Sequence, residues 1–287
     1  MRVMKPEGRN RALRGVLAAV PTPVTPGGEP DTERFLVHAH WCLDNGCDGL
    51  NVLGTTGEAN SLSKSQRLVV MEAVADGLDP SRLMVGTGTP DATTTIELTR
   101  AAEDMGYAGA LILPPYYYKG VSDDGLFNWF ASVIEATEGI RIYLYNFPQM
   151  TGVPLTHALV RRLAEAYPNR VAGAKDSSGD LAYAAEIASI DGLDIFPSDE
   201  AALALAETEG FAGCISATVN VTASLAARLW RAQTDTALLA KVRSRRQSIA
   251  AHPLIPAVKH LVARLHADTG FERLLPHHFG FVHLDIS

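Results

Sequence analysis

Cysteine is scarce in this sequence, and its three cysteines, Cys42, Cys47 and Cys214, form no C-x-x-C pair. An odd number of widely spaced cysteines argues against a disulfide scaffold and against a zinc knuckle, and it indicates a reducing compartment. Long apolar runs are also missing, since none approaches the roughly 20 residues that a membrane span needs. We therefore expect a cytoplasmic protein.

Positive charge is not in excess either. The 287 residues include 25 Lys and Arg against 32 Asp and Glu, which gives a formal net charge of −7. Proteins that bind nucleic acids or anionic membranes usually carry a basic surface, so we expect neither as a partner. Hydrophobic residues make up 47% of the chain and charged residues 20%, a composition that can form a buried core and excludes a disordered chain.

Signatures of bound cofactors and metals are weak. The segment Gly86-Thr-Gly-Thr-Pro90 lacks the third glycine of a dinucleotide-binding loop, and no G-x-x-x-x-G-K-[ST] run occurs. His38 and His40 lie two residues apart within a helical pattern and face different sides of it. We expect neither a cofactor nor a metal site.

Short runs rich in Val, Ile and Leu alternate with helix-periodic segments, which is typical of βα units around a parallel sheet. The eight predicted strands are residues 15–22, 49–54, 83–88, 109–114, 141–148, 171–176, 194–198 and 213–218. The predicted helix N-caps are Asp31, Ser63 (with Gln66 as a capping box), Asp91, Ser122, Thr156, Ser198 and Thr222.

A weak internal repeat supports this organisation. The segments Gly46-Cys-Asp-Gly49, Gly106-Tyr-Ala-Gly109 and Gly210-Phe-Ala-Gly213 each follow a helical pattern and precede an apolar run. Their first glycine suits a left-handed helix end, and their second suits a tight entry into the next strand. The eight strand–helix units predict a (β/α)₈ barrel over residues 1–232, with an open doubly wound sheet as the alternative. Two further helices, 236–251 and 254–267, predict a helical extension over residues 233–287 that packs on the barrel.

Lys175 is the most informative candidate for chemistry. The chain contains six lysines, and this one ends an apolar strand at the face where barrel enzymes place their active sites. An ammonium group there is partly desolvated, which favours the free amine as a nucleophile toward a carbonyl. The alternative is a structural ion pair with Asp176 or another carboxylate.

Hydroxyl groups cluster in the neighbouring loops. Tyr145 ends the strand before the one that carries Lys175, so its phenol can lie beside the amine and transfer protons. The pair Thr55-Thr56 and the run Tyr116-Tyr117-Tyr118 could complete a relay of hydroxyls. Alternatively, the threonines belong to an ordinary turn and the tyrosines to an aromatic patch at a subunit interface.

These motifs resemble those of the dihydrodipicolinate synthase and N-acetylneuraminate lyase family, which are class I, Schiff-base pyruvate aldolases. The resemblance covers nearly the whole chain. It extends from Ala18-Ala-Val-Pro-Thr-Pro23 through G-T-T-G-E, P-Y-Y-Y-K, Y-N-F-P and G-A-K-D-S-S-G-D to Gly213-Cys-Ile-Ser216. It implies a (β/α)₈ barrel and a lyase, commonly assembled as a homotetramer that is a dimer of dimers.

The resemblance also implies residue roles. Lys175 would form an imine with the 2-oxo group of pyruvate or a pyruvate-derived acid, with Tyr145 as the proton-transfer residue. Thr55 and Thr56 would bind the carboxylate of that acid, and one hydroxyl would link to Tyr145. Tyr117 matches an aromatic residue that completes the relay in a neighbouring subunit. Ile215 matches a residue whose main-chain carbonyl faces the lysine.

The chain departs from the lysine-pathway synthase at one informative position. That enzyme has an arginine after its catalytic tyrosine, in Y-N-x-P-x-R-T-G, which binds the carboxylate of aspartate semialdehyde. Met150 occupies the position here, and a thioether offers no charged donor. We expect the second substrate to have an uncharged end near Met150, or a charge that is met elsewhere, for example by contacts to Ser177, Ser198 or Glu200. The alternative is that another arginine reaches the pocket from a different loop or subunit and restores a carboxylate site. Asp199-Glu200 also resembles an Asp-Glu pair of the neuraminate lyases.

The predicted function is a lyase that makes or breaks a carbon–carbon bond between an enzyme-bound pyruvate enamine and an aldehyde, with or without loss of water. A 2-keto-3-deoxy sugar acid aldolase or dehydratase fits this description. The lysine-pathway synthase is the alternative within the family, and Met150 disfavours it. A catalytically silent small-molecule sensor is the alternative outside it, although a sensor has no need of the whole set of Lys175, Tyr145 and both threonines.

Overall fold

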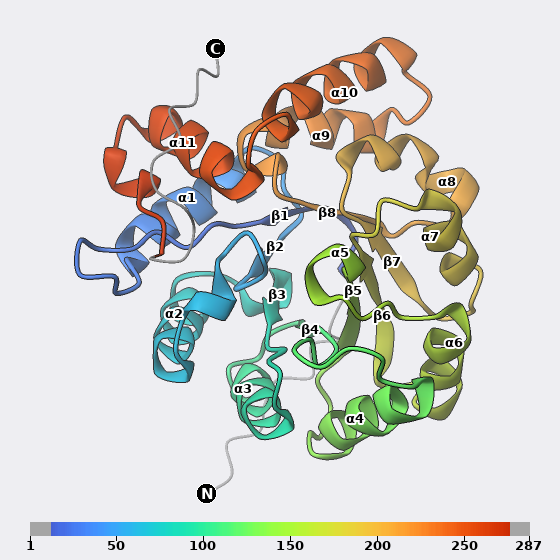
Figure 1. The fold of residues 1–287 in the computed structure, drawn as a ribbon. Coiled ribbons are helices and arrows are strands. Elements are labelled where there is room, and N and C mark those ends of the chain that lie inside the picture. Colours follow the sequence, from blue (N-terminus) through green and yellow to red (C-terminus); the bar gives the residue numbers. More distant parts are fainter. Residues whose placement is uncertain (1–12, 276–287) are drawn as a thin grey trace, which may run out of the picture.

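The computed structural model describes residues 13–275. The start of the predicted barrel region 1–232 and the end of the predicted extension 233–287 therefore lie outside the described residues. Eight parallel strands form one sheet in the order β7-β6-β5-β4-β3-β2-β1-β8. Their bounds are β1 Gly15–Ala19, β2 Gly49–Val52, β3 Leu83–Gly86, β4 Gly109–Ile112, β5 Ile142–Asn146, β6 Val171–Asp176, β7 Asp194–Pro197 and β8 Gly213–Ser216. Helices surround the strands on the outside, which confirms the (β/α)₈ barrel with a C-terminal helical part (Figure 1).

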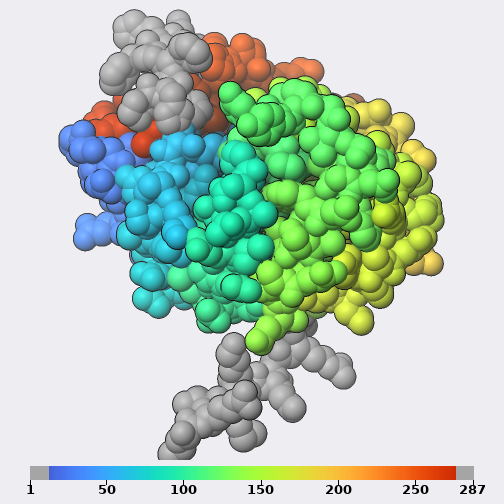
Figure 2. Space-filling model, turned by 60° about the horizontal axis from the view of Figure 1, so that its bottom comes forward, coloured from blue at the N-terminus to red at the C-terminus, as the bar shows by residue number. Residues whose placement is uncertain are grey.

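The helices follow the strands in chain order. They are α1 Thr32–Asp44, α2 Lys64–Gly77, α3 Ala92–Asp104, α4 Asp123–Glu135, α5 Pro148–Thr151, α6 His157–Ala166, α7 Leu181–Ala188, α8 Ala206–Glu209, α9 Val219–Arg231, α10 Thr236–Ala250 and α11 Leu254–His266. Consecutive outer helices from α1 to α4 contact one another, as do α4, α6 and α7. Figure 2 shows this part of the chain as one continuous surface, from blue through green to yellow. Within the described residues, no helix is both long and apolar enough to cross a membrane.

Local sequence explains most helix starts. The side chains of Asp31, Ser63, Asp91, Ser122 and Thr156 each accept a backbone N–H at the start of their helix, as predicted, and Ser63 with Gln66 forms the capping box. These caps satisfy donors that the first helical turn leaves without a partner.

Two predicted caps are wrong. Asp199, not Ser198, caps the short 3₁₀ helix Glu200–Leu205, and its carboxylate accepts the N–H of Ala201 at 2.8 Å. Thr222 lies inside α9 at a kink, with φ −124° and ψ 16°, and its hydroxyl donates to the carbonyl of Thr218 at 3.0 Å. A turn of helix therefore precedes the predicted start, because this hydroxyl bonds backward along the chain instead of capping forward.

The three glycine repeats have the predicted conformations. Gly46, Gly106 and Gly210 adopt φ values of +106°, +80° and +76°, in the left-handed region that favours glycine. The second glycine of each repeat begins β2, β4 or β8. At Gly213 a Cβ atom would lie 1.8 Å from the carbonyl oxygen of Gly15 on β1, so only glycine permits this strand contact.

Alternate strand residues fill the barrel. Leu17, Met84, Leu111, Tyr143 and Phe196 point inward and are almost completely buried. The interior is therefore a packed core rather than a channel, and it supports the residues at the carboxyl ends of the strands. A larger apolar cluster fills the space between the strands and the outer helices.

Strands β7 and β8 close the barrel differently from the others. No ladder joins them in the described part of the chain; a backbone hydrogen bond of 2.9 Å runs from the N–H of Ala212 to the carbonyl of Ile195. Above it, at the carboxyl ends, the hydroxyl of Ser216 donates to Glu200 at 2.7 Å. Side chains thus join the two strands at the face where the active site is expected.

The extension packs against the start of α9. Ile249 of α10 and Val258, Leu261 and Val262 of α11 form a buried cluster with Ala217 of the β8–α9 connection. Figure 1 shows α10 beside α9, and α11 next to α1. The two helices therefore lie over one side of the barrel at its carboxyl end.

Candidate active site

A cavity of about 780 Å³ opens at the carboxyl ends of the strands. Strands β5, β6 and β8 contribute Tyr145, Lys175 and Ile215 to its lining, and the loop after β2 contributes Thr55 and Thr56. The remaining lining residues are Phe147, Met150, Asp176, Ser177, Ser178, Gly179, Leu181, Pro197, Ser198, Asp199, Ala217, Arg246, Pro253, Leu254, Ile255 and Pro256. The cavity thus collects side chains from five segments of the barrel and from the extension.

Lys175 and Tyr145 are neighbours at the base of this cavity. They are register partners on β6 and β5, so both side chains point into the barrel. The Nζ atom of Lys175 lies 4.5 Å from the centre of the Tyr145 ring, and both residues are almost completely buried, at 4% and 3% exposure. The amine and the phenol are therefore placed side by side, as the sequence predicts.

The alternative ion pair between Lys175 and Asp176 does not form. Asp176 is the next strand residue and faces the other way, where Asn146 donates to its carboxylate at 2.7 Å and Ser178 donates at 2.8 Å. Burial raises the pKa of Asp176, against the opposing effect of these hydrogen bonds. Among residues 13–275, no hydrogen bond or ion pair engages Nζ of Lys175, which leaves the amine available to a substrate.

Thr55 links the loop after β2 to the tyrosine. Its Oγ1 atom lies 3.2 Å from the Tyr145 hydroxyl, so the two groups can share a proton. Thr56 is buried, at 6% exposure, and lines the same cavity. The predicted link between a threonine hydroxyl and Tyr145 is therefore present within one chain.

Most of the remaining predicted residues lie at the cavity. Ile215, Met150, Ser177 and Ser198 line it, and Met150 projects from α5 with 60% of its surface exposed. Tyr117 does not line it: the side chain is 74% exposed and packs edge-on against Tyr118. Its predicted role in a neighbouring subunit stays a prediction.

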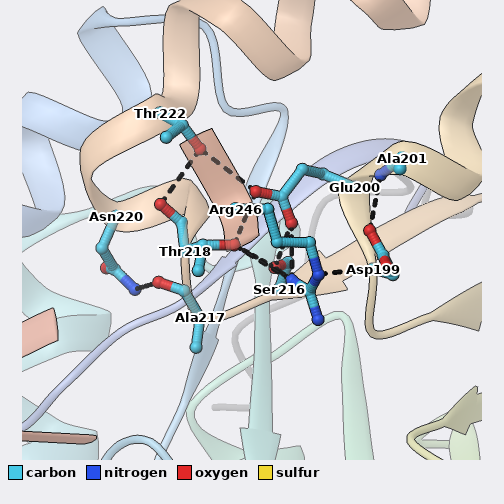
Figure 3. Close-up of polar contacts among 9 residues, drawn as sticks. All are labelled: Asp199, Glu200, Ala201, Ser216, Ala217, Thr218, Asn220, Thr222 and Arg246. Carbon is cyan, nitrogen blue, oxygen red and sulfur yellow. Dashed lines mark hydrogen bonds and ion pairs between the residues drawn. The ribbon is translucent and has the colours of Figure 1, made fainter. Parts of the chain in front are cut away.

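Glu200 lies behind the lining instead of on it. Its buried carboxylate, 1% exposed, accepts from the hydroxyls of Ser216 and Thr218 and pairs with Arg246 at 2.8 Å (Figure 3). A direct contact between Glu200 and a substrate is therefore not favoured by this geometry. The residue instead holds Arg246 at the cavity.

Sequence analysis left open that an arginine from another segment reaches the pocket, but it did not identify Arg246, and it missed the segment 253–256. Arg246 lies on the inward stripe of α10, four residues after the buried Val242 and three before the buried Ile249. A charged residue at a position where helical periodicity requires an apolar one is the signal that could have identified it. The segment 253–256 carries no comparable signal, because an apolar stretch of that kind packs equally well in a core.

The arrangement can perform carbonyl chemistry. A buried amine without a partner among the described residues can add to a carbonyl, and a phenol hydrogen-bonded to a hydroxyl can move the protons that such an addition requires. The polar lining near the strands suits a small acid, while the outer lining from α5, α7 and α11 is largely apolar.

Comparison with known proteins agrees with this geometry. Residues 12–271 match the model of the dihydrodipicolinate synthetase family. The chain is 34% identical over 210 residues to the 4-hydroxy-tetrahydrodipicolinate synthase of Coxiella burnetii, covering 73% of this chain and 71% of the relative.

Two solved structures superimpose on nearly the whole chain. Dihydrodipicolinate synthase from Agrobacterium tumefaciens is 31% identical, with a TM-score of 0.85 and 94% of each chain covered. The prophage protein YagE from E. coli K12, solved in complex with pyruvate, is 26% identical, with a TM-score of 0.83 and the same coverage. From the match over almost its full length and the barrel it forms, this chain belongs to the dihydrodipicolinate synthetase family of lyases.

Proposed function

We propose that the protein is a class I aldolase that binds pyruvate, or a pyruvate-derived 2-oxo acid, as an imine of Lys175. The observation that carries this proposal is the Nζ atom of Lys175, which is buried, faces the cavity and lies 4.5 Å from the centre of the Tyr145 ring. The solved YagE complex with pyruvate, on the same fold, supports the choice of acid.

The proposed reaction is balanced without a cofactor. The amine adds to C2 of pyruvate and water leaves, which forms a protonated imine. Loss of a proton from C3 gives an enamine, and C3 then attacks the carbonyl carbon of an aldehyde. Water hydrolyses the new imine, releases the product and restores the amine; cleavage is the same sequence in reverse. The protonated imine is the electron sink, so no metal or cofactor enters the proposal.

The neighbouring residues have defined roles in this proposal. Tyr145 transfers the protons, and Thr55, with its Oγ1 atom 3.2 Å from the phenol, passes them on. Hydroxyl and amide groups of Thr55 and Thr56 bind the carboxylate of the acid, and the carbonyl of Ile215 faces the imine. The exposed Tyr117 completes the relay from a second subunit of a cytoplasmic homotetramer.

The experiment that tests the proposal is reductive trapping. Borohydride added with pyruvate reduces the imine to a secondary amine, so mass spectrometry should find a stable adduct on the peptide that contains Lys175. Lys175→Ala should lose the adduct, and Lys241→Ala, at an exposed position of α10, should retain it. A wild-type Lys175 peptide that stays unmodified contradicts the mechanism and favours a catalytically silent sensor.

A second measurement separates the alternatives within the family. Met150 lacks the guanidinium that would bind the carboxylate of aspartate semialdehyde, an interaction of roughly 1.5–3 kcal/mol. We therefore expect kcat/KM for that aldehyde to be about ten- to a hundredfold below that of a synthase with the arginine. A kcat/KM of about 10⁴ M⁻¹s⁻¹ or more for the condensation of aspartate semialdehyde with pyruvate would instead identify a lysine-pathway synthase.

A further inference from the structure

Arg246 brings a second basic side chain to the cavity that contains Lys175. Of the described residues that line the cavity, these two alone are basic. Arg246 comes from α10, outside the barrel, and its side chain is 21% exposed. Arg246 thus belongs to a late segment of the chain, whereas Thr55 and Thr56 follow β2 and Met150 belongs to α5.

Two edges of its guanidinium are already in contact. Nη1 lies 2.8 Å from Glu200 and 3.1 Å from the hydroxyls of both Ser216 and Thr218, and Nε lies 3.0 Å from the carboxylate of Asp199 (Figure 3). The third edge is different: within residues 13–275, Nη2 makes no hydrogen bond. Arg246 therefore has two N–H donors left for a ligand.

The surrounding charges define which acceptor fits. Asp199, Glu200 and Arg246 together carry a formal charge of −1, because two carboxylates flank one guanidinium. A ligand carboxylate or phosphate at Nη2 would be repelled at short range by this net negative charge. An uncharged oxygen would still gain a charge-assisted hydrogen bond without that repulsion.

The lining side chains from the outer helices α5, α7 and α11 do not compete for such an oxygen. Met150 of α5, Leu181 of α7, and Leu254 and Ile255 of α11 present apolar side chains to the cavity. Away from the strand ends, the guanidinium is therefore the charged donor available to the far part of a substrate bound at Lys175.

We propose that Arg246 determines specificity for the second substrate: its Nη2 donates to a hydroxyl or carbonyl oxygen of an uncharged aldehyde, while Glu200 and Asp199 hold the guanidinium in place. The proposal rests on the imine at Lys175. It assigns substrate selection to a residue of the helical extension, and it selects against aldehydes with a negatively charged end.

Three aldehydes on one three-carbon skeleton test it. Propanal has no further oxygen, glyceraldehyde has two hydroxyls, and glyceraldehyde 3-phosphate adds a phosphate; each is condensed with pyruvate and kcat/KM is measured. The wild-type chain should prefer glyceraldehyde over propanal by about ten- to a hundredfold. It should also prefer glyceraldehyde over its phosphate. Arg246→Met should reduce the first ratio to near one, and Arg243→Met, at an exposed position of the same helix, should not change it.

Loss of Arg246 leaves the buried Glu200 without its cation, so the single variant can fail to fold. Arg246→Met with Glu200→Gln removes both charges, and thermal unfolding checks that this variant is folded. The ratio of two aldehydes is the readout because a general loss of stability lowers both rates together.

The outcomes separate the two proposals. An equal ratio in the wild-type chain and the folded Arg246 variant overturns the role of Arg246, as does a wild-type preference for the phosphate. Trapping of pyruvate at Lys175 without condensation of glyceraldehyde also overturns it and leaves the imine intact. Absence of trapping in the wild-type chain instead overturns the proposed function.

Discussion

The phenol of Tyr145 lies between two polar groups that differ in kind. On one side is the Thr55 hydroxyl at 3.2 Å, and beneath the ring face is the Lys175 amine, 4.5 Å from its centre. A hydroxyl that both donates and accepts suits a proton relay, and the ring face places the phenol beside the amine. The tyrosine is thus placed to transfer protons next to the amine.

Tyr145→Phe tests the proton transfer. It keeps the ring over Lys175 and removes the hydroxyl, so we expect turnover to fall about 10²- to 10⁴-fold, as is usual when a positioned proton-transfer group is lost. Steady-state release of pyruvate from a cleavable 2-oxo acid measures this. Tyr143→Phe is the matched control, since Tyr143 is on the same strand face, two residues deeper and away from the cavity lining. Near wild-type turnover of Tyr145→Phe would assign the relay to another residue.

The sequence predicts the centre of this site better than its rim. Lys175, Tyr145 and Thr55 follow directly from strand ends, because parallel strands of a barrel all end at one face. Arg246 could not be placed in the same way. Its helix carries an inward stripe, but periodicity does not tell which part of the barrel that stripe covers.

At the scale of elements, α1 shows how a buried polar group is satisfied between helices. Nε2 of His38 lies 3.0 Å from Oδ1 of Asn220 on α9, and Nδ1 lies 3.0 Å from Nε2 of His266 on α11. The Asn220 amide nitrogen already donates to the carbonyls of Ala19 and Ala217, so its oxygen faces the histidine. His38 therefore donates from Nε2 and accepts at Nδ1, which is the neutral form of the ring. Burial lowers the pKa of His38 to about 4.

This histidine predicts a loss of stability in mild acid. Its pKa is about 4 in the folded protein and near 6.5 when exposed, so between these values the unfolded chain binds more protons. The free energy of unfolding therefore decreases as the pH falls, by about 2 kcal/mol between pH 7 and pH 5 from this group.

Urea unfolding at both pH values measures the effect. His38→Gln, which stays uncharged and can donate to Asn220, should lose about 2 kcal/mol less than the wild-type chain over this interval. His40→Gln, at an exposed position of the same helix, should behave like the wild type. Equal losses in His38→Gln and the wild type would mean that other groups cause the acid sensitivity.

Helix boundaries show a similar division between local and distant causes. Caps such as Ser63 follow from neighbouring residues, and the sequence predicts them. The cap of α7 is Asp180, whose carboxylate accepts the N–H groups of Ala182 and Tyr183; it was missed within the polar run that follows Lys175. The kink at Thr222 involves the buried Glu200, 3.4 Å from its hydroxyl, and no local pattern reports a contact with the preceding βα unit.

At the scale of the whole molecule, a buried ion pair connects the extension to the active-site loop. Lys259 of α11 and Glu58, two residues after Thr56, are 1% and 2% exposed and form an ion pair. Lys259 also donates to the carbonyl of Arg273 at 2.7 Å, and Glu58 accepts the N–H of Leu275 at 3.0 Å. The sequence predicts that the extension packs on the barrel, but this pairing of residues 201 positions apart has no local signal.

Removing one partner should therefore be costly. Lys259→Met removes the buried cation that pairs with Glu58, and we expect the free energy of unfolding to fall by about 3–5 kcal/mol. Lys259→Met with Glu58→Gln removes both charges and keeps an acceptor for Leu275, so most of the stability should return. Lys241→Met, at an exposed position of α10, should change it by less than about 0.5 kcal/mol. Urea unfolding of the three variants decides; a double variant as unstable as the single one contradicts the charge argument.

The seam between β7 and β8 has a consequence for how this pocket can change. Glu200 follows β7 and Ser216 ends β8, and both contact the guanidinium of Arg246. Glu200 and Ser216 therefore connect the carboxyl ends of β7 and β8 and also hold Arg246 at the cavity wall. Replacing Arg246 to admit another aldehyde also removes its contacts with Glu200 and Ser216 at the ends of β7 and β8. These two residues must therefore be redesigned in the same step. Over evolutionary time, positions 200, 216 and 246 should accordingly vary as a set. New specificities should arise more readily at Met150, which lies on α5 away from these three residues.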